Sequence, residues 1–334
     1  MKKIKFILSL LILLSITLTS CAPSLSELPS DEPESTPQVT TTKKENKNDK
    51  TNTNEKEEKE IMQKEDPKSD NKINILMIGN SYCYYYVEEL YGMAKTVGVD
   101  LNIYNLYASG AELREHWTWH TNKANECELY QTNENGRKKI SSGITLTNTL
   151  KKENWDIISF QEGGRVYRTG GIDGLRGEKV YLEKLLGYVK EQFPMTKYYW
   201  HCSWVPQVGY SNESQGFYIN TKEDEVTYQQ AKITVSKEIR DEFNLPIIPS
   251  GAAWLDARYN PVINNQLCLR KGNPDDLSHD GDIGGGQYLN ACVWFEVLTG
   301  KSCVGNSWRP DYELSEAKIA VLQAAAHKAV SQYK

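Results

Sequence analysis

Residues 75–81 read ILMIGNS, and this short stretch decides the fold. Its four leading apolar residues are typical of a strand that is buried on both faces of a parallel sheet. Gly79 permits a sharp backbone turn, and Asn80 and Ser81 favour turns and helix N-caps. Apolar residues recur at helical spacing from Val87, which predicts a helix directly after the turn. The stretch therefore indicates the first strand–turn–helix unit of an α/β fold.

Ser81 is expected at the carboxyl edge of this sheet. Ligands of open α/β folds bind at that edge, and the unpaired N–H groups of a helix N-terminus can stabilise negative charge there. Ser81 therefore has two possible roles: it carries chemistry, or it only caps the helix that follows. Taken alone, the stretch favours the simpler capping role.

Residues 1–20 have the layout of a secretory signal. Three lysines within the first five residues precede an apolar run over residues 7–18, which is short for a membrane span. Leu-Thr-Ser-Cys at residues 18–21 then resembles a bacterial lipobox. It implies cleavage before Cys21 and lipidation of the Cys21 thiol. A plain signal peptide with an incidental cysteine is the alternative.

Residues 21–72 are expected to form a disordered tether. The segment is rich in Ser, Thr, Pro, Glu, Lys and Asn, so it cannot bury enough apolar surface to offset its ordering entropy. We expect a lipid-anchored protein on the outer side of the cell membrane, with the anchor as its only membrane contact. The formal net charge is −5 and becomes −8 without the three signal lysines, so nothing suggests a nucleic-acid partner.

From residue 73 to residue 334 the sequence alternates strand and helix patterns, which favours one domain. We predict five strands, at residues 73–78, 101–107, 155–160, 197–203 and 246–248. Helical periodicity or composition marks further stretches at residues 180–193, 223–243, 288–298 and 316–333. Alternating units with short connections predict a parallel sheet that is covered by helices on both sides.

The cysteines after Cys21 offer two interpretations. None of the six forms a CxxC pair, which argues against a zinc or redox site. An extracellular location permits disulfides. However, Cys202 falls in a predicted strand and Cys292 in an apolar helix, so buried free thiols are at least as well supported.

A catalytic serine needs a base, and five histidines are available. His327 lies on the Ala-rich last helix, and His201 lies in a predicted strand. His116 and His120 are one helical turn apart, as in a metal pair, but no third ligand accompanies them. His279 differs, because it lies in a polar loop before the penultimate helix.

Asp276 precedes His279 by three residues. In a loop, this spacing lets the carboxylate fold back onto the imidazole Nδ1 and leaves Nε2 free for a serine hydroxyl. An Asp-x-x-His pair is weak evidence alone, because chance supplies many of them. Its place before the penultimate helix of an α/β chain makes it informative.

Three motifs together resemble the SGNH (GDSL-type) hydrolase superfamily. They are Gly79-Asn80-Ser81 after the first strand, Ala108-Ser109-Gly110 after the second, and Asp276-x-x-His279 near the end. Their order matches that family's blocks one, two and five, and the resemblance covers the whole domain. It implies a flavodoxin-like, three-layer α/β/α sandwich with a five-stranded parallel sheet. It also implies that Ser81 is the nucleophile, His279 the base and Asp276 the residue that orients the base.

The resemblance further implies an oxyanion hole with the backbone N–H groups of Ser81 and Gly110. In the family, a third donor is usually an Asn in Gly-x-Asn-Asp after the third strand, whereas this chain has Gln161-Glu-Gly-Gly there. The Gln161 amide can donate as Asn does, from one methylene further out. The chain thus resembles a bacterial lipoprotein branch with Gly-Asn-Ser in block one and Gln in block three.

The resemblance implies a serine carboxylic-ester hydrolase that works through an acyl-serine intermediate, without a metal or cofactor. The expected substrate is an acylated carbohydrate, with O-acetyl groups on an extracellular polysaccharide. Polar and aromatic residues near the motifs suit sugar rings, although several of them could instead be core. They are Tyr82, Tyr84, Tyr85, Tyr86, Trp117, Glu162, Arg165, His201 and Trp204. The alternatives are a lipid or lysophospholipid esterase and a non-catalytic, glycan-binding lipoprotein.

The lipobox yields a first prediction. Wild-type protein should incorporate a metabolically labelled lipid precursor and fractionate with membranes, because the Cys21 thiol is lipidated. Cys21→Ala should release the protein or leave an unprocessed precursor. A wild type that takes up no label would contradict the lipobox.

Overall fold

Strand β1 (Lys72–Gly79) lies at the centre of the sheet. Ile75 and Met77 point into the core on one face, and Leu76 and Ile78 point into the core on the other. All four side chains are fully buried. A strand with apolar residues on both faces must be covered on both, which explains the continuous apolar run. The predicted doubly buried strand is confirmed.

The computed structural model describes residues 72–273, 277–279 and 282–333. The predicted signal, lipobox and tether, including Cys21, lie outside these residues, and so does Asp276. Among the helices in the described ranges, none is long and apolar enough to cross a membrane.

The main sheet has the strand order β4-β3-β2-β1-β5-β6-β9. Its other strands are β2 (Asp100–Tyr107), β3 (Cys127–Asn133), β4 (Gly136–Ile144), β5 (Ile157–Phe160), β6 (Lys197–His201) and β9 (Ile247–Ile248). Five of the seven run parallel, in the order β2-β1-β5-β6-β9. This is the 2-1-3-4-5 order of flavodoxin-like folds. All five predicted parallel strands are present.

The antiparallel strands β3 and β4 extend the sheet to seven strands, which corrects the prediction of five. Strand β4 is more polar than the central strands, because it is the exposed edge of the sheet. Lysines on such an edge oppose pairing with other chains. The Asn135-Gly136 dipeptide at the turn, which favours hairpins, was missed in the sequence analysis.

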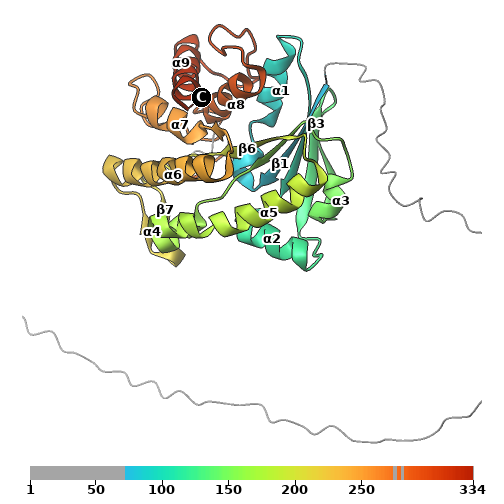
Figure 1. Cartoon of the computed structure of the whole chain (residues 1–334). Helices are drawn as coiled ribbons and strands as arrows, with labels where there is room; N and C mark the ends of the chain where they lie inside the picture. The colour runs from blue at the N-terminus through green and yellow to red at the C-terminus, as the bar shows by residue number, and fades with distance from the viewer. Residues whose placement is uncertain (1–71, 274–276, 280–281, 334) are drawn as a thin grey trace, which may run out of the picture. The chain divides into compact units, whose positions relative to one another are not determined.

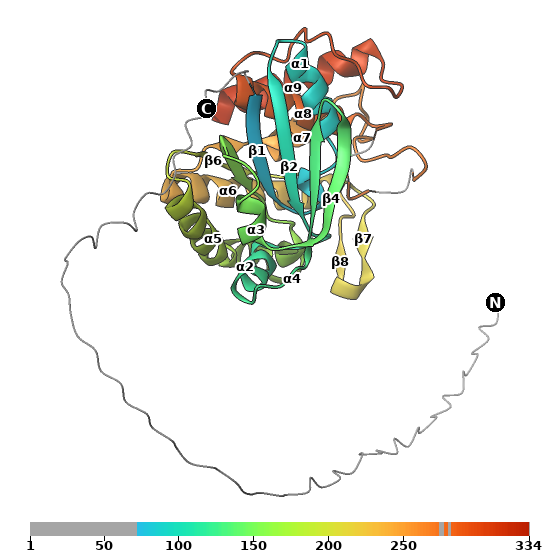
Figure 2. The same ribbon diagram turned by 90° about the vertical axis from the view of Figure 1, so that its right-hand side faces the viewer.

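Helices cover both faces of the sheet, as Figures 1 and 2 show. One face packs against α1 (Val87–Lys95), α7 (Ser250–Arg258), α8 (Gly286–Thr299) and α9 (Glu316–Tyr333). The other packs against α2 (Leu113–Thr121), α3 (Leu146–Leu150), α4 (Arg165–Gly177), α5 (Lys179–Gln192) and α6 (Lys222–Phe243). The predicted three-layer α/β/α sandwich is therefore confirmed. In the sequence, a small hairpin lies between β6 and α6. It consists of β7 (Ser211–Asn212) and β8 (Phe217–Tyr218) and projects from the domain (Figure 2).

The turn after β1 differs from the prediction of an immediate helix. Ser81–Cys83 form a 3₁₀ turn, and α1 begins only at Val87. The N-cap of the 3₁₀ turn is Asn80, whose side chain accepts a hydrogen bond from the Tyr82 N–H. The interpretation of Ser81 as a cap is therefore wrong, and its hydroxyl is available for another role.

All six cysteines in the described part of the chain are buried and free. They are Cys83, Cys127, Cys202, Cys268, Cys292 and Cys303. The interpretation as buried thiols is therefore confirmed for these residues.

Candidate active site

The hydroxyl of Ser81 and the imidazole of His279 meet at the carboxyl edge of the sheet. Ser81 Oγ lies 3.1 Å from His279 Nε2, although the two residues are 198 positions apart. Ser81 comes from the turn after β1, and His279 comes from the loop before α8. The contact has the length of a hydrogen bond through which a base can take a hydroxyl proton.

A pocket of about 200 Å³ opens beside this pair. The described residues that line it come mainly from loops at the ends of β1, β2 and β5 and from the start of α4. They are Asn80, Ser81, Tyr82, Ser109, Gly110, Glu112, Gly163, Arg165, Arg168, Tyr210, Ser278 and His279. None of these side chains is aliphatic, so the described lining is polar and aromatic.

Residues 277–279 are held by hydrogen bonds to their backbone carbonyls. The Gln207 N–H donates to the carbonyl of Leu277 at 2.9 Å, and the Tyr82 hydroxyl donates to the carbonyl of Ser278 at 3.3 Å. When Nε2 of His279 accepts from Ser81, its Nδ1 carries the proton and can donate to Ser278 Oγ at 3.0 Å. The orienting role of Asp276 stays a prediction, because that residue lies outside the described residues.

Two backbone N–H groups are placed to bind an oxyanion. Ser81 and Gly110 both line the pocket, and no hydrogen bond from either N–H is found within residues 72–273, 277–279 and 282–333. Gly110 has a φ of 64°, a left-handed conformation that favours glycine. A side chain at this position would be strained, and glycine also leaves room for an approaching oxygen.

Asn80 joins the loops that follow three neighbouring strands. Its Oδ1 accepts from the Tyr82 N–H at 3.0 Å, and its Nδ2 donates to the Ala111 carbonyl at 2.7 Å. Its backbone N–H donates to Gln161 Oε1 at 3.3 Å. The side chain is buried, so these bonds are shielded from water. Asn80 thereby sets the position of Gly110 relative to Ser81.

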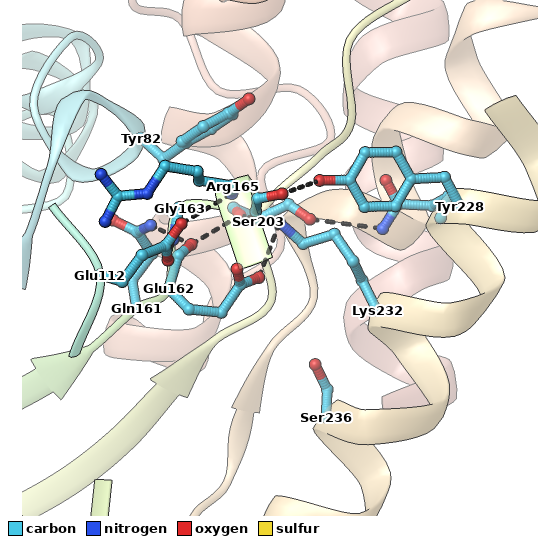
Figure 3. A network of polar contacts seen from close by, with 12 residues as sticks. Tyr82, Glu112, Gln161, Glu162, Gly163, Arg165, Ser203, Tyr228, Lys232 and Ser236 are labelled. Carbon is cyan, nitrogen blue, oxygen red and sulfur yellow. Dashed lines mark hydrogen bonds and ion pairs between the residues drawn. The ribbon is translucent and has the colours of Figure 1, made fainter. Parts of the chain in front are cut away.

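Glu112 makes a second link between two of these loops (Figure 3). Its Oε2 accepts from the Gly163 N–H and its Oε1 accepts from the Arg165 N–H, both at 2.6 Å. Burial, and then the nearby carboxylate of Glu162, raise the pKa of Glu112 to about 7. Gly163 must be glycine here, because an added Cβ would overlap Asn80 Nδ2.

Gln161 does not lie where the predicted third oxyanion donor would. Its side chain is 1% exposed and is not among the described pocket-lining residues. Its amide nitrogen donates to the Glu162 carbonyl (Figure 3), and its oxygen accepts from the Asn80 N–H. The amide packs over Gly79, where a Cβ would collide with its oxygen. The extra methylene thus lets the amide bridge β5 and the turn after β1 instead of facing the pocket.

Several residues that were expected at a sugar-binding rim are core instead. Tyr86 and Trp204 are fully buried, and Trp204 stacks on Trp254 at a centroid distance of 4.6 Å. Glu162 is buried and forms an ion pair of 2.8 Å with Lys232. Tyr82 and Arg165 do line the pocket.

His201 and His116 have structural roles. His201 Nε2 lies 2.9 Å from Ser250 Oγ, and burial lowers the pKa of His201 to about 3. His116 donates from Nε2 to the Gly79 carbonyl at 3.1 Å, and burial lowers its pKa to about 4. No group of three or more potential metal ligands is found in the described parts of the chain, so His116 and His120 are without a third ligand there.

Three site residues were missed by the sequence analysis. Glu112 and Arg168 lie on or beside helices and resembled ordinary surface charges, and Tyr210 belongs to the segment before β7. The only local signal was the position of Glu112 two residues after Gly110. Their convergence depends on the fold.

Asn80 yields a prediction. Asn80→Asp should lower the free energy of unfolding by roughly 1–3 kcal/mol, because a carboxylate keeps the bond from Tyr82 but cannot donate to the Ala111 carbonyl. Urea unfolding measures the difference. Asn260→Asp is the matched control. The Asn260 side chain accepts from the Val262 N–H, a bond that an aspartate also makes, and its amide nitrogen donates to no described residue. Equal losses in the two variants would contradict the bridging role of Asn80.

Glu112 yields a pH-dependent prediction. Its pKa rises from an ordinary 4.5 to about 7 on folding, so the folded state holds this proton more tightly. Its contribution to stability is therefore complete below pH 4.5 and is lost as the pH rises towards 7. The stability of wild type relative to Glu112→Gln should fall over that window by at most about 3 kcal/mol.

Urea unfolding of both proteins at pH 4.5, 6 and 7.5 measures this change. Glu191→Gln, at an exposed position on α5, controls for the loss of a surface carboxylate. A stability difference between wild type and Glu112→Gln that stays constant with pH would contradict the raised pKa.

The chain is similar to several proteins of known structure. A crystal structure of a DUF4886 family protein from Bacteroides uniformis is 25% identical, with a TM-score of 0.67 over 78% of this chain and 95% of that one. A Parabacteroides merdae protein described as a GDSL-like lipase is 15% identical, with a TM-score of 0.43 over 69% and 96% of the two chains.

An acetylxylan esterase from Geobacillus stearothermophilus is 14% identical, with a TM-score of 0.40 over 69% of this chain and 94% of that one. No curated protein matches the chain significantly. The family model described as "Domain of unknown function (DUF4886)" matches residues 74–329, which is most of the chain. The chain therefore belongs to the DUF4886 family.

Proposed function

We propose that the protein is a serine esterase of the SGNH type that hydrolyses carboxylic esters through an acyl-serine intermediate. The observation that carries this proposal is the 3.1 Å contact between Ser81 Oγ and His279 Nε2 in a pocket also lined by Gly110. A hydroxyl, a base and two backbone donors are the groups that acyl transfer requires. We assign all four to this one pocket.

In the first step, His279 Nε2 takes the proton of the Ser81 hydroxyl while Oγ attacks the ester carbonyl carbon. The carbonyl oxygen becomes an oxyanion that accepts from the N–H groups of Ser81 and Gly110. The bond from the carbonyl carbon to the alcohol oxygen then breaks, and the imidazolium protonates the departing alcohol.

In the second step, water attacks the acyl-serine, and His279 takes a proton from that water. The carboxylic acid leaves and Ser81 recovers its proton. Asp276 is proposed to orient the imidazole and to stabilise the imidazolium. Asn80, Glu112 and Gln161 position the three loops and do not touch the reacting atoms in this scheme.

The pocket favours a short acyl group on a polar alcohol. A lipid esterase needs an apolar channel for its acyl chain, whereas the described lining residues include no aliphatic side chain. Tyr82 and Tyr210 offer aromatic surface, and Ser109 and Arg165 offer polar contacts. We therefore propose O-acetyl groups on carbohydrate as the substrate class. Anchoring through Cys21 on the outer side of the membrane would give access to extracellular polysaccharide.

The catalytic pair is tested directly by substitution. Ser81→Ala and His279→Ala should each lower kcat on an aryl acetate by at least about a thousand-fold, because nucleophile and base act as a unit. Both variants should stay folded by circular dichroism. Ser331→Ala, on the exposed face of α9, is the matched control and should keep wild-type kcat.

Mass spectrometry of wild type trapped with a slow ester should find the acyl group on Ser81. Wild-type turnover that persists in purified Ser81→Ala would identify a different nucleophile. No turnover of aryl acetates or acetylated polysaccharides in wild type, together with glycan binding, would support the non-catalytic alternative.

A further inference from the structure

Two arginines from the first turn of α4 line the pocket beside Ser81. They differ in how their charges are balanced. Arg165 forms an ion pair with Glu115 on α2 and donates its backbone N–H to Glu112. The charge of Arg165 is therefore already matched by a carboxylate.

Arg168 has no carboxylate partner in the part of the chain that the structure describes. Its Nε donates to the amide oxygen of Gln215 at 2.5 Å, a neutral partner that leaves the positive charge uncompensated. Gln215 belongs to the 3₁₀ turn Glu213–Gln215 between β7 and β8, so this hairpin holds the guanidinium in place. The two Nη groups have no hydrogen bond to described residues.

The Arg168 guanidinium also influences the hydroxyl of Tyr82, which lines the pocket. Burial raises the pKa of the Tyr82 hydroxyl strongly, and the charge of Arg168 is the largest opposing influence. Tyr82 is the residue next to Ser81 and lines the same pocket. The positive charge of Arg168 therefore acts on the residue next to the Ser81 hydroxyl.

The carboxylates near the pocket do not cancel this charge. Glu112 directs its oxygens at the Gly163 and Arg165 N–H groups. Glu162 is buried and paired with Lys232, which also donates to Ser203 (Figure 3). An arginine whose planar fork is held by one neutral contact is well suited to bind a carboxylate with its remaining N–H groups.

We propose that Arg168 selects acidic saccharides, by binding the carboxylate of a uronate unit while the acetyl ester of the same saccharide lies at Ser81. This inference rests on the proposed esterase function and adds the charge of its substrate. The alcohol product is a uronate-containing saccharide, and the acid product is acetate.

The test uses O-acetylated galacturonan with free carboxylates and the same polymer with methyl-esterified carboxyls. Acetate release is measured for wild type, Arg168→Gln and Arg168→Lys. Arg176→Gln is the matched control, because Arg176 lies on the same helix but pairs with Glu238 and Asp173.

Wild type should have a lower KM for the acidic polymer than for the neutral one. Arg168→Gln should raise the KM for the acidic polymer about tenfold, near the low end for a hydrogen bond to a charged group because Arg168 is half-exposed. Its KM for the neutral polymer should rise much less, because that polymer has no free carboxylate for Arg168 to bind. Arg168→Lys should recover part of the selectivity, and Arg176→Gln should match wild type.

Equal KM values of wild type for the two polymers would overturn the inference and leave the esterase proposal intact. The same holds if Arg168→Gln weakens both substrates equally. Absence of wild-type turnover on both polymers would overturn the inference, and absence of turnover on aryl acetates as well would overturn the esterase proposal.

A binding experiment separates the two proposals, because it needs no turnover. Isothermal titration of Ser81→Ala with a galacturonate trimer should give binding that Arg168→Gln weakens about tenfold in the double variant. Inorganic phosphate should compete poorly. Competition by phosphate as strong as by the trimer would overturn the assignment to an acidic saccharide, and unchanged trimer affinity would overturn the role of Arg168.

Discussion

The site depends on two hydrogen bonds made by the buried carboxamide of Asn80. Its oxygen caps the turn that carries Ser81, and its nitrogen binds the carbonyl of Ala111, next to Gly110. An aspartate in its place could accept but not donate, so it could not make both bonds. The Asn80 amide, which both donates and accepts, thus sets the distance between Ser81, the proposed nucleophile, and Gly110, a proposed oxyanion donor. The burial of that amide makes each of its bonds costly to lose.

A second layer of buried charge holds the loop after β5. Glu112 binds the loop from α2, and the Glu162–Lys232 pair ties it to α6 (Figure 3). Tyr228, also on α6, donates to the Gly164 carbonyl at 2.8 Å. Removing one member of a buried ion pair leaves an uncompensated charge, which costs about 3–5 kcal/mol. We infer that these contacts hold the loop in position, while the Nη groups of Arg168 have no hydrogen bond to any described residue.

Gln161 illustrates how one methylene changes a role. Its position at the end of β5 matches that of a family donor, but its amide turns over Gly79 and bonds to backbone on both sides. The aromatic residues predicted for the rim divide in a similar way. Trp204 is core, whereas Tyr82 lines the pocket. Aromatic side chains suit both environments, so their residue type alone could not separate these outcomes.

The sequence by itself determined the five parallel strands and the sandwich of layers, which followed from apolar runs and helical periodicity. The pairing of Ser81 with His279 was expected from the resemblance of three ordered motifs to the SGNH superfamily. Only the tertiary structure decided which polar side chains converge on the pocket. Glu112, Arg168 and Tyr210 come from separate segments, and their local sequence is that of ordinary surface residues. The edge hairpin β3–β4 was also missed, because the exposed strand β4 has no apolar face and only the Asn135-Gly136 turn marks it locally.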